Sequence, residues 1–285
     1  MQNNIITIEN ENIKAQINLF GGAFYSLIDK ETNEQLLWQG DEKWWGDRDL
    51  VLFPFACRRK DGFYTINGVR YDMPIHGFAK DSVFTVESVN DDSVVITLES
   101  DDKSRKIYPY DFTFKVEYAL KGKSVAVKYR VFNKSDKEMY FSVGGHFGVR
   151  LNAQTGNFVR FSKAVTEHYP LDGLFVKDKE RLSEKLTEVE LNKALMKKYA
   201  TLICANDGLN SLIFERKGGK GLKFTYDSPV MAFWTNPNGG DYYCVEAWWG
   251  LPDEAVVKRE IADKKLMYKL NGKQTFSCGY EIEIL

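Results

Sequence analysis

Two of the three histidines in the chain lie beside glycines, in the segments His76-Gly77-Phe78-Ala79 and Gly144-Gly145-His146. A glycine next to a histidine lets backbone or a ligand approach closely and leaves the imidazole edge accessible. Imidazole is also the side chain best suited to proton transfer near neutral pH. The pattern predicts that His76 and His146 share one concave surface. The alternative, a histidine that is satisfied in the core or in a turn, stays open for each of them.

One carboxylate, Glu246, is embedded in the apolar and aromatic segment Tyr242–Trp249. Burial raises the pKa of a carboxylic acid and makes it a stronger base at neutral pH, and an unpaired buried carboxylate needs a partner or a purpose. The alternative is a strand residue that faces outward, as expected for Glu281 and Glu283. The bulky apolar neighbours favour burial, which would make the Glu246 carboxylate a better base at neutral pH.

Two consecutive arginines, Arg58 and Arg59, follow the apolar run 52–57. A guanidinium group offers five donors and no acceptor, which suits the ring oxygen and hydroxyls of a sugar. The residue pattern equally fits the end of a strand where it meets solvent, and composition alone does not decide between these two interpretations.

The elements that must position these residues are mostly strands. Alternating apolar and polar residues recur between turn signals, and the segments at 90–92 and 121–123 are typical of hairpin connections. One helix is expected over residues 186–198, and the charged runs 101–103 and 177–181 are expected to be solvated loops. This pattern predicts an all-β protein, a large β-sandwich that forms a single domain over residues 1–285. The strands are expected at 5–8, 13–18, 23–28, 83–89, 93–98, 112–118, 124–133, 200–204, 211–215, 222–226, 230–234 and 279–285.

Composition excludes several classes of function. The 39 basic and 40 acidic residues are spread along the chain and give a net charge of −1, which offers no electrostatic basis for binding nucleic acid or an anionic membrane. The first residues resemble no secretory signal, no apolar run is long enough to span a membrane, and the four cysteines form no zinc or redox motif. Free thiols in the cytoplasm are therefore expected. The aromatic content of 14% fits both strands and the stacking of sugar rings.

Several segments in order along the chain resemble the aldose 1-epimerase (mutarotase) superfamily, and within it the LacX-like branch of bacteria. They are Leu52-Phe-Pro-Phe with Arg58 and Asp61-Gly62, Tyr71-Asp-Met-Pro-Ile-His76-Gly-Phe-Ala, Phe141-Ser-Val-Gly-Gly-His146, Phe233-Trp234 and Cys244-Val-Glu246-Ala-Trp248-Trp-Gly250-Leu-Pro-Asp253. Each motif alone is weak, whereas their combined order and spacing over nearly the whole chain are specific.

The resemblance implies a large antiparallel β-sandwich, a supersandwich, with a sugar in a concave cleft and no metal or organic cofactor. By this resemblance Glu246 matches the general base that removes the proton from the anomeric hydroxyl, and His146 matches the general acid that protonates the ring oxygen. His76 matches a second histidine that supports the ring oxygen or a hydroxyl, and Arg58 matches a sugar-binding arginine. Trp234 and Trp248 are expected to form walls of the cleft. His168 matches no catalytic position and is expected to be a polar loop residue.

The chain also departs from the family pattern. Lys80 stands where the family often has arginine, Arg59 where an apolar residue is usual, and Phe147 where proline is common. Because Arg150 follows shortly after His146, an acidic or phosphorylated sugar is one alternative substrate, with Lys80, Arg150 and Arg59 as the expected contacts.

The expected function is the interconversion of the α and β anomers of a hexose such as galactose or glucose. Two alternatives stay open: a 1-epimerase of phosphorylated hexoses, and a catalytically silent sugar-binding protein on the same fold. A glycosidase is disfavoured because it usually needs two carboxylates, and only one has a matching context here. The sequence predicts a small sugar as the partner and leaves the oligomeric state open.

Overall fold

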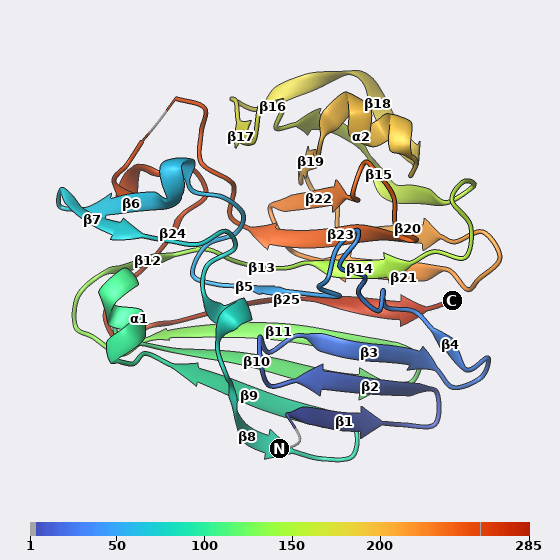
Figure 1. Cartoon of the computed structure of the whole chain (residues 1–285), viewed down its shortest axis with the longest axis horizontal. Helices are drawn as coiled ribbons and strands as arrows, with labels where there is room; N and C mark the ends of the chain where they lie inside the picture. The colour runs from blue at the N-terminus through green and yellow to red at the C-terminus, as the bar shows by residue number, and fades with distance from the viewer. Residues whose placement is uncertain (1–3, 257) are drawn as a thin grey trace.

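The computed structural model of the chain describes residues 4–256 and 258–285. Antiparallel sheets dominate these residues, and every ladder between named strands is antiparallel (Figure 1). A small sheet contains β1 (Ile5–Glu9), β2 (Ile13–Asn18), β3 (Phe24–Asp29) and β4 (Glu34–Gln35). The strand β2 alternates strictly between buried and half-buried residues, as expected for a strand with one face on the core.

A much larger sheet carries most of the chain. In spatial order it contains β5 (Val51–Leu52), β13 (Val143–Gly145), β23 (Tyr242–Trp249), β22 (Val230–Trp234), β19 (Leu202–Ala205), β15 (Phe158–His168), β20 (Ser211–Glu215), β21 (Leu222–Tyr226), β25 (Thr275–Ile284), β11 (Ser124–Asn133), β10 (Phe112–Lys121), β9 (Ser93–Glu99) and β8 (Thr85–Val89). Two further strands pair with members of this path, β14 (Phe147–Arg150) with β23 and β18 (Glu180–Glu190) with β15.

Among the described residues, the remaining elements are three small sheets, two short α-helices and three 3₁₀ turns. Three two-stranded sheets pair β6 (Phe63–Ile66) with β7 (Val69–Asp72), β12 (Met139–Phe141) with β24 (Tyr268–Leu270), and β16 (Leu171–Asp172) with β17 (Phe175–Val176). The helices of the described chain are α1 (Asp102–Ile107) and α2 (Lys193–Tyr199), with single 3₁₀ turns at Lys60–Gly62, Ala79–Asp81 and Ile261–Asp263. Neither α-helix is long and apolar enough to cross a membrane.

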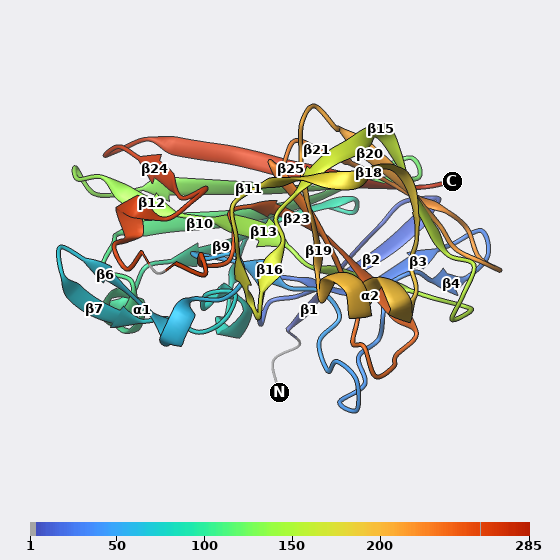
Figure 2. The same ribbon diagram turned by 90° about the horizontal axis from the view of Figure 1, so that it is seen from above.

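The two main sheets pack face to face, so the molecule is the expected large antiparallel β-sandwich (Figure 2). Phe24 from β3 lies with its ring centroid 4.7 Å from that of Tyr118 on β10 and 5.7 Å from that of Phe147 on β14. The Tyr118 hydroxyl also donates to the Gly22 carbonyl at 2.6 Å. Apolar burial between the layers and these edge-to-face aromatic pairs hold the sandwich together.

The strands predicted from alternation are all present, with boundaries shifted by a few residues. The predicted helix over residues 186–198 is confirmed only in its second half, because residues 186–190 belong to strand β18 and the helix α2 spans Lys193–Tyr199. β18 and its partner β15 pair along much of their length through an irregular register, which breaks the simple alternation of apolar residues. This long-range pairing outweighs the weak local helical pattern.

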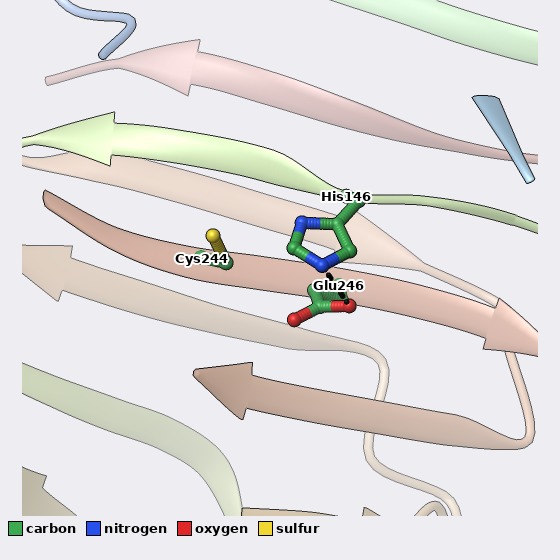
Figure 3. A group of neighbouring side chains, drawn as sticks. All are labelled: His146, Cys244 and Glu246. Atoms are coloured by element: carbon green, nitrogen blue, oxygen red, sulfur yellow. Dashed lines mark ion pairs between the residues drawn. The ribbon is translucent and has the colours of Figure 1, made fainter. Parts of the chain in front are cut away.

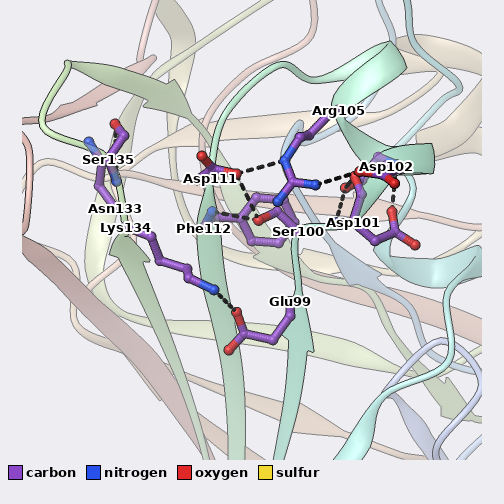
Figure 4. Close-up of polar contacts among 11 residues, drawn as sticks. Glu99, Ser100, Asp101, Asp102, Arg105, Asp111, Phe112, Asn133, Lys134 and Ser135 are labelled. Carbon is purple, nitrogen blue, oxygen red and sulfur yellow. Dashed lines mark hydrogen bonds and ion pairs between the residues drawn. The ribbon is translucent and has the colours of Figure 1, made fainter.

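The charged run at 101–103, expected to be a loop, instead begins helix α1 (Figure 4). The Asp101 side chain accepts from the Ser104 N–H at 2.7 Å, while the Asp101 N–H donates to the Ser104 hydroxyl at 2.9 Å. This reciprocal cap satisfies two backbone N–H donors at the first turn, those of Asp101 and Ser104. Arg105 then joins Asp102 and Asp111 and fastens the helix to the start of β10. The other run, 177–181, enters strand β18 at residue 180.

Candidate active site

A cleft of about 540 Å³ opens beside the strands β13, β14, β22 and β23. All six residues predicted to form a site, Arg58, His76, His146, Trp234, Glu246 and Trp248, line this single cleft. Its polar lining also includes Asp47, Lys80 and Thr201, and its apolar lining includes Trp45, Leu50, Cys57, Ile75, Leu171, Leu174, Met196 and Ile203. The size and the mixture of apolar walls with a few polar groups are those of a small-molecule site.

Strand register brings His146 and Glu246 together. Gly144 pairs with Trp248 and Phe147 with Val245, so His146, in the single-residue break between β13 and β14, lies opposite Glu246 on β23. The imidazole Nε2 lies 3.1 Å from the Glu246 carboxylate Oε2 (Figure 3). Both side chains are almost completely buried. The outward-facing alternative for Glu246 is therefore wrong, and every residue of β23 is buried.

Burial shifts both groups of this pair toward their neutral forms. It raises the pKa of Glu246 well above its usual value, which a hydrogen bond from the Trp248 indole Nε1 at 3.1 Å only partly offsets. Burial also lowers the pKa of His146 to about 3. Because burial favours the neutral form of each group, a single proton transfer across the 3.1 Å between Oε2 and Nε2 would convert the neutral pair into a carboxylate and an imidazolium.

His76 lies beside this pair, with its ring centroid 5.3 Å from that of His146. Its backbone has φ 65°, and a Cβ on the following Gly77 would lie 2.2 Å from the Phe53 carbonyl oxygen. Glycine is thus needed where the loop packs against the Phe53 backbone, which explains the His-Gly sequence. The Cys57 N–H donates to His76 Nδ1 at 3.2 Å, so the neutral ring, whose pKa is lowered mainly by burial, carries its proton on Nε2.

The two arginines left open by the sequence have different environments. Arg58 lines the cleft and is only partly buried. Arg59 is buried, donates to Asp253 Oδ1 at 2.7 Å, and also donates to the carbonyl oxygens of Ala56 and Leu251 at 2.8 Å. The strand-end interpretation is therefore wrong for Arg59, and this residue lies in a buried ion cluster outside the cleft lining.

Three tryptophans shape the cleft, of which the sequence singled out two. Trp234 lies on β22 with its ring centroid 6.0 Å from that of His146. Trp248 has a polar contact in addition to its wall position, because its indole N–H holds Glu246. Trp45 lies in the loop before β5, with its ring centroid 5.0 Å from that of His146. The sequence analysis did not predict it as a site residue. The sequence signal for it was the Trp44-Trp45 pair, a rare concentration of the largest side chain.

Other residues of the cleft lining were not predicted from the sequence, because each is a single residue on a separate loop. Asp47 and Thr201 add polar groups to the lining, and Cys57 adds a thiol whose pKa is raised to about 11 by burial. Asp47 and Thr201 belong to no local motif, and Cys57 ends the apolar run 52–57 without a pattern that marks it as a cleft residue. The cleft brings them together only through the folding of loops that lie far apart in the sequence.

The departures from the family pattern fall mostly outside the cleft. Arg150 is exposed and lies in a separate surface groove with Glu34, Asn152 and Gly219, so its expected contact with an acidic sugar is wrong. Phe147 is buried in the core, where it packs between the two sheets rather than on the cleft wall. Lys80 does line the cleft, and its ammonium lies 2.6 Å from Asp81.

His168 is neither a loop residue nor part of the cleft. It ends strand β15, is buried, and its Nε2 lies 3.3 Å from the Glu180 carboxylate. Its ring also meets Tyr199 of α2 edge to face, with 5.7 Å between centroids. These contacts fasten β18 and α2 to the large sheet, which is a structural role.

Comparison with known proteins agrees with this architecture. The model of the aldose 1-epimerase family matches residues 4–254. The chromosomal protein LacX of Lactococcus lactis subsp. lactis is 26% identical over 98% of this chain and 99% of that protein. A galactose mutarotase related enzyme from Lactobacillus acidophilus is similar with a TM-score of 0.93 and 28% identity, over 99% of this chain and 97% of that chain. A galactose mutarotase-like protein from Lactobacillus casei has the same fold, with a TM-score of 0.94 at 23% identity over 99% and 100% of the two chains.

Proposed function

Because the chain belongs to the aldose 1-epimerase family, we propose that it interconverts the α and β anomers of a hexose such as galactose or glucose. The observation that carries this proposal is the buried His146–Glu246 pair, with Nε2 and Oε2 3.1 Å apart in the lining of a sugar-sized cleft. Mutarotation needs one proton removed from O1 and one delivered to the ring oxygen, and these two oxygens are bonded to the same carbon. A carboxylate and an imidazolium held side by side match that demand.

In the proposed reaction the pair first shifts its shared proton from Glu246 to His146. The Glu246 carboxylate then takes the proton of the anomeric hydroxyl while the His146 imidazolium protonates the ring oxygen. The C1–O5 bond breaks and an open-chain aldehyde forms. After rotation about C1–C2, the neutral imidazole accepts the proton of the O5 hydroxyl, O5 attacks the other face of C1, and the Glu246 carboxylic acid returns a proton to O1.

Four further residues are proposed to bind the sugar. The Nε2–H of His76 is available as a donor, because its Nδ1 is occupied by the Cys57 N–H. Arg58 offers guanidinium donors to hydroxyl groups from the rim of the cleft. Trp234 and Trp248 supply apolar faces against which C–H groups of the pyranose ring can pack.

Charge near the cleft favours a neutral sugar over a phosphorylated one. Of the three cations considered for a phosphate, Arg59 is bound to Asp253 and Arg150 lies in another groove. The remaining candidate, Lys80, already has Asp81 as a partner and shares the lining with Asp47. A phosphate would therefore meet Arg58 and Lys80 against the carboxylates of Asp47 and Asp81, a poor match for a dianion.

A silent sugar-binding protein is the competing proposal. A binder needs hydrogen bonds and stacking, but it gains nothing from a buried carboxylate that lacks a compensating cation. Such a group costs folding free energy, because its charged form is poorly solvated. The retention of both members of the acid–base pair thus favours turnover.

Polarimetry of freshly dissolved α-D-galactose and α-D-glucose tests the proposal. The protein should accelerate the approach to the anomeric equilibrium, and Glu246→Gln and His146→Asn should each remove most of that acceleration. Glu281→Gln, which changes a carboxylate on β25 outside the cleft, is the matched control and should behave as the unchanged protein. Sugar binding in calorimetry without any acceleration would replace the epimerase by the silent binder.

A further inference from the structure

We propose that His146, Cys244 and Glu246 form a binding site for a thiophilic divalent cation such as Zn²⁺, and that occupation of this site inhibits the enzyme. The Nδ1 or Nε2 of the histidine, the cysteine Sγ and a carboxylate oxygen all lie within 4.8 Å of one another (Figure 3). The inhibitory consequence rests on the function proposed above, whereas the binding itself does not.

Strand geometry places the three side chains on one face of the sheet. Cys244 and Glu246 are two residues apart on β23, so they point to the same side. Gly148 of β14 pairs with Cys244, and the ladder places His146 opposite Glu246, so His146 lies diagonally across from the thiol. Opposite Cys244, the Trp45 ring covers Gly148, because a Cβ on this glycine would lie 2.8 Å from that ring.

The donor set suits zinc. Bonds of about 2.0–2.2 Å to nitrogen and oxygen and about 2.3 Å to sulfur would put tetrahedral ligand atoms roughly 3.3–3.7 Å apart. The three ligand atoms already lie within 4.8 Å of one another, so metal binding requires them to draw somewhat closer. Imidazole, thiolate and carboxylate together select borderline cations such as Zn²⁺ over Mg²⁺ and Ca²⁺. The fourth position would face the cleft that His146 and Glu246 line, open to water.

Charge balance also favours a dication at this place. Cys244 and Glu246 are both buried, so an anionic form of either side chain needs a compensating positive charge nearby. A dication between a thiolate and a carboxylate makes the group neutral as a whole, with the displaced protons released to solvent. The ion would occupy the imidazole lone pair and the carboxylate that the proposed mechanism needs for proton transfer, so bound metal and turnover exclude each other.

Titration with Co²⁺ tests the binding directly, because a Co²⁺–thiolate bond gives a near-ultraviolet charge-transfer band. The unchanged protein should develop this band, and Zn²⁺ should abolish it by displacement. Cys244→Ser should lose the band and bind Zn²⁺ at least about tenfold more weakly. Cys57→Ser is the matched control, because its thiol lines the cleft outside the cluster, and it should keep the band. Cys244→Ala, with circular dichroism of each variant, separates loss of the ligand from loss of the fold.

Inhibition is measured separately by polarimetry. Zn²⁺ should slow mutarotation by the unchanged protein, excess chelator should restore the rate, and Cys244→Ser should require at least about tenfold more Zn²⁺ for the same inhibition. No band in the unchanged protein, or a band lost in Cys57→Ser and kept in Cys244→Ser, overturns the site. A band in a protein that shows no turnover with any sugar would support the metal site while removing the proposed function. Metal binding with undiminished turnover would overturn the inhibition.

Discussion

Glu246 and Asp253 are two buried carboxylates only seven residues apart, yet their surroundings are opposite. Asp253 Oδ1 accepts from Arg59 Nη1 and from Lys264 Nζ, each at 2.7 Å, and its Oδ2 accepts from the Lys60 N–H at 2.9 Å. Among the described residues, Glu246 forms no ion pair with a lysine or arginine and is held by a tryptophan N–H and a histidine. The Asp253 carboxylate has two cationic partners, whereas the Glu246 carboxylate has no lysine or arginine partner among the described residues.

The different surroundings of the two carboxylates suit them to different tasks, Asp253 to holding backbone in place and Glu246 to proton transfer. The Asp253 backbone N–H donates to the Arg58 carbonyl at 3.0 Å, and Arg59 holds the Ala56 carbonyl, so the ion cluster fixes the loop that presents Cys57 and Arg58 to the cleft. A compensated charge costs less to bury and is suited to holding backbone in place. An uncompensated one has a raised pKa and is suited to accepting and returning a proton.

The largest expected effect is the loss of turnover in Glu246→Gln. Removing a general base should slow the enzymatic part of mutarotation by about 10²–10⁴-fold. The fold should be kept, because glutamine preserves the shape and can still accept from Trp248. The rate is measured by polarimetry after subtraction of the uncatalysed reaction, and retained turnover would assign the base to another group.

Breaking the compensated carboxylate should instead damage stability. Asp253→Asn leaves Arg59 and Lys264 buried beside each other with no anion, which should lower the free energy of unfolding by about 3–5 kcal/mol. Urea denaturation measures this loss. The matched control is Asp72→Asn, which breaks the exposed Arg70–Asp72 pair and should have a much smaller effect. Equal losses for both variants would contradict the structural role of the cluster.

Sequence reasoning predicted the burial of Glu246 and missed the ion cluster of Asp253 for a physical reason. The burial of Glu246 can be predicted from its own strand, because it has apolar neighbours on both sides in the sequence. The partners of Asp253 are 194 and 11 residues away, and no local pattern distinguishes Arg59, which is buried, from Arg58, which lines the cleft. The same limit applies to Trp45 and Asp47 in the cleft and to the paired strands β15 and β18. Alternation predicts isolated strands well, whereas long-range pairings depend on the whole fold.

A moderate effect is expected for Arg58→Ala. If the guanidinium donates to a sugar hydroxyl, its removal should raise KM by roughly 10-fold to 100-fold, the equivalent of a hydrogen bond to a charged group of about 1.5–3 kcal/mol. The value of kcat should change less, because Arg58 transfers no proton in the proposed reaction. Arg70→Ala, on the exposed hairpin β6–β7, is the control. A fall in kcat at unchanged KM would move Arg58 from binding to the chemical step.

The smallest effect is a gain in stability in Glu246→Gln that depends on pH. Burial raises the pKa of Glu246 in the folded chain, so the stability linked to its proton is fully present below the unfolded pKa of about 4.3 and is lost as the pH rises through the folded value. Glutamine cannot ionise, so the variant should exceed the unchanged protein in Tm by a margin that grows from pH 4 to pH 8. His146, whose pKa is lowered to about 3, titrates in the opposite sense, but it is present in both proteins and its contribution largely cancels in the difference.

Differential scanning calorimetry measures this difference in Tm. The Tm of a chain of this size shifts by roughly 2–4 °C per kcal/mol, so the effect can be resolved. A margin that shrank toward pH 8 would mean that Glu246 is stabilised as an anion, and the contrast with Asp253 would then disappear.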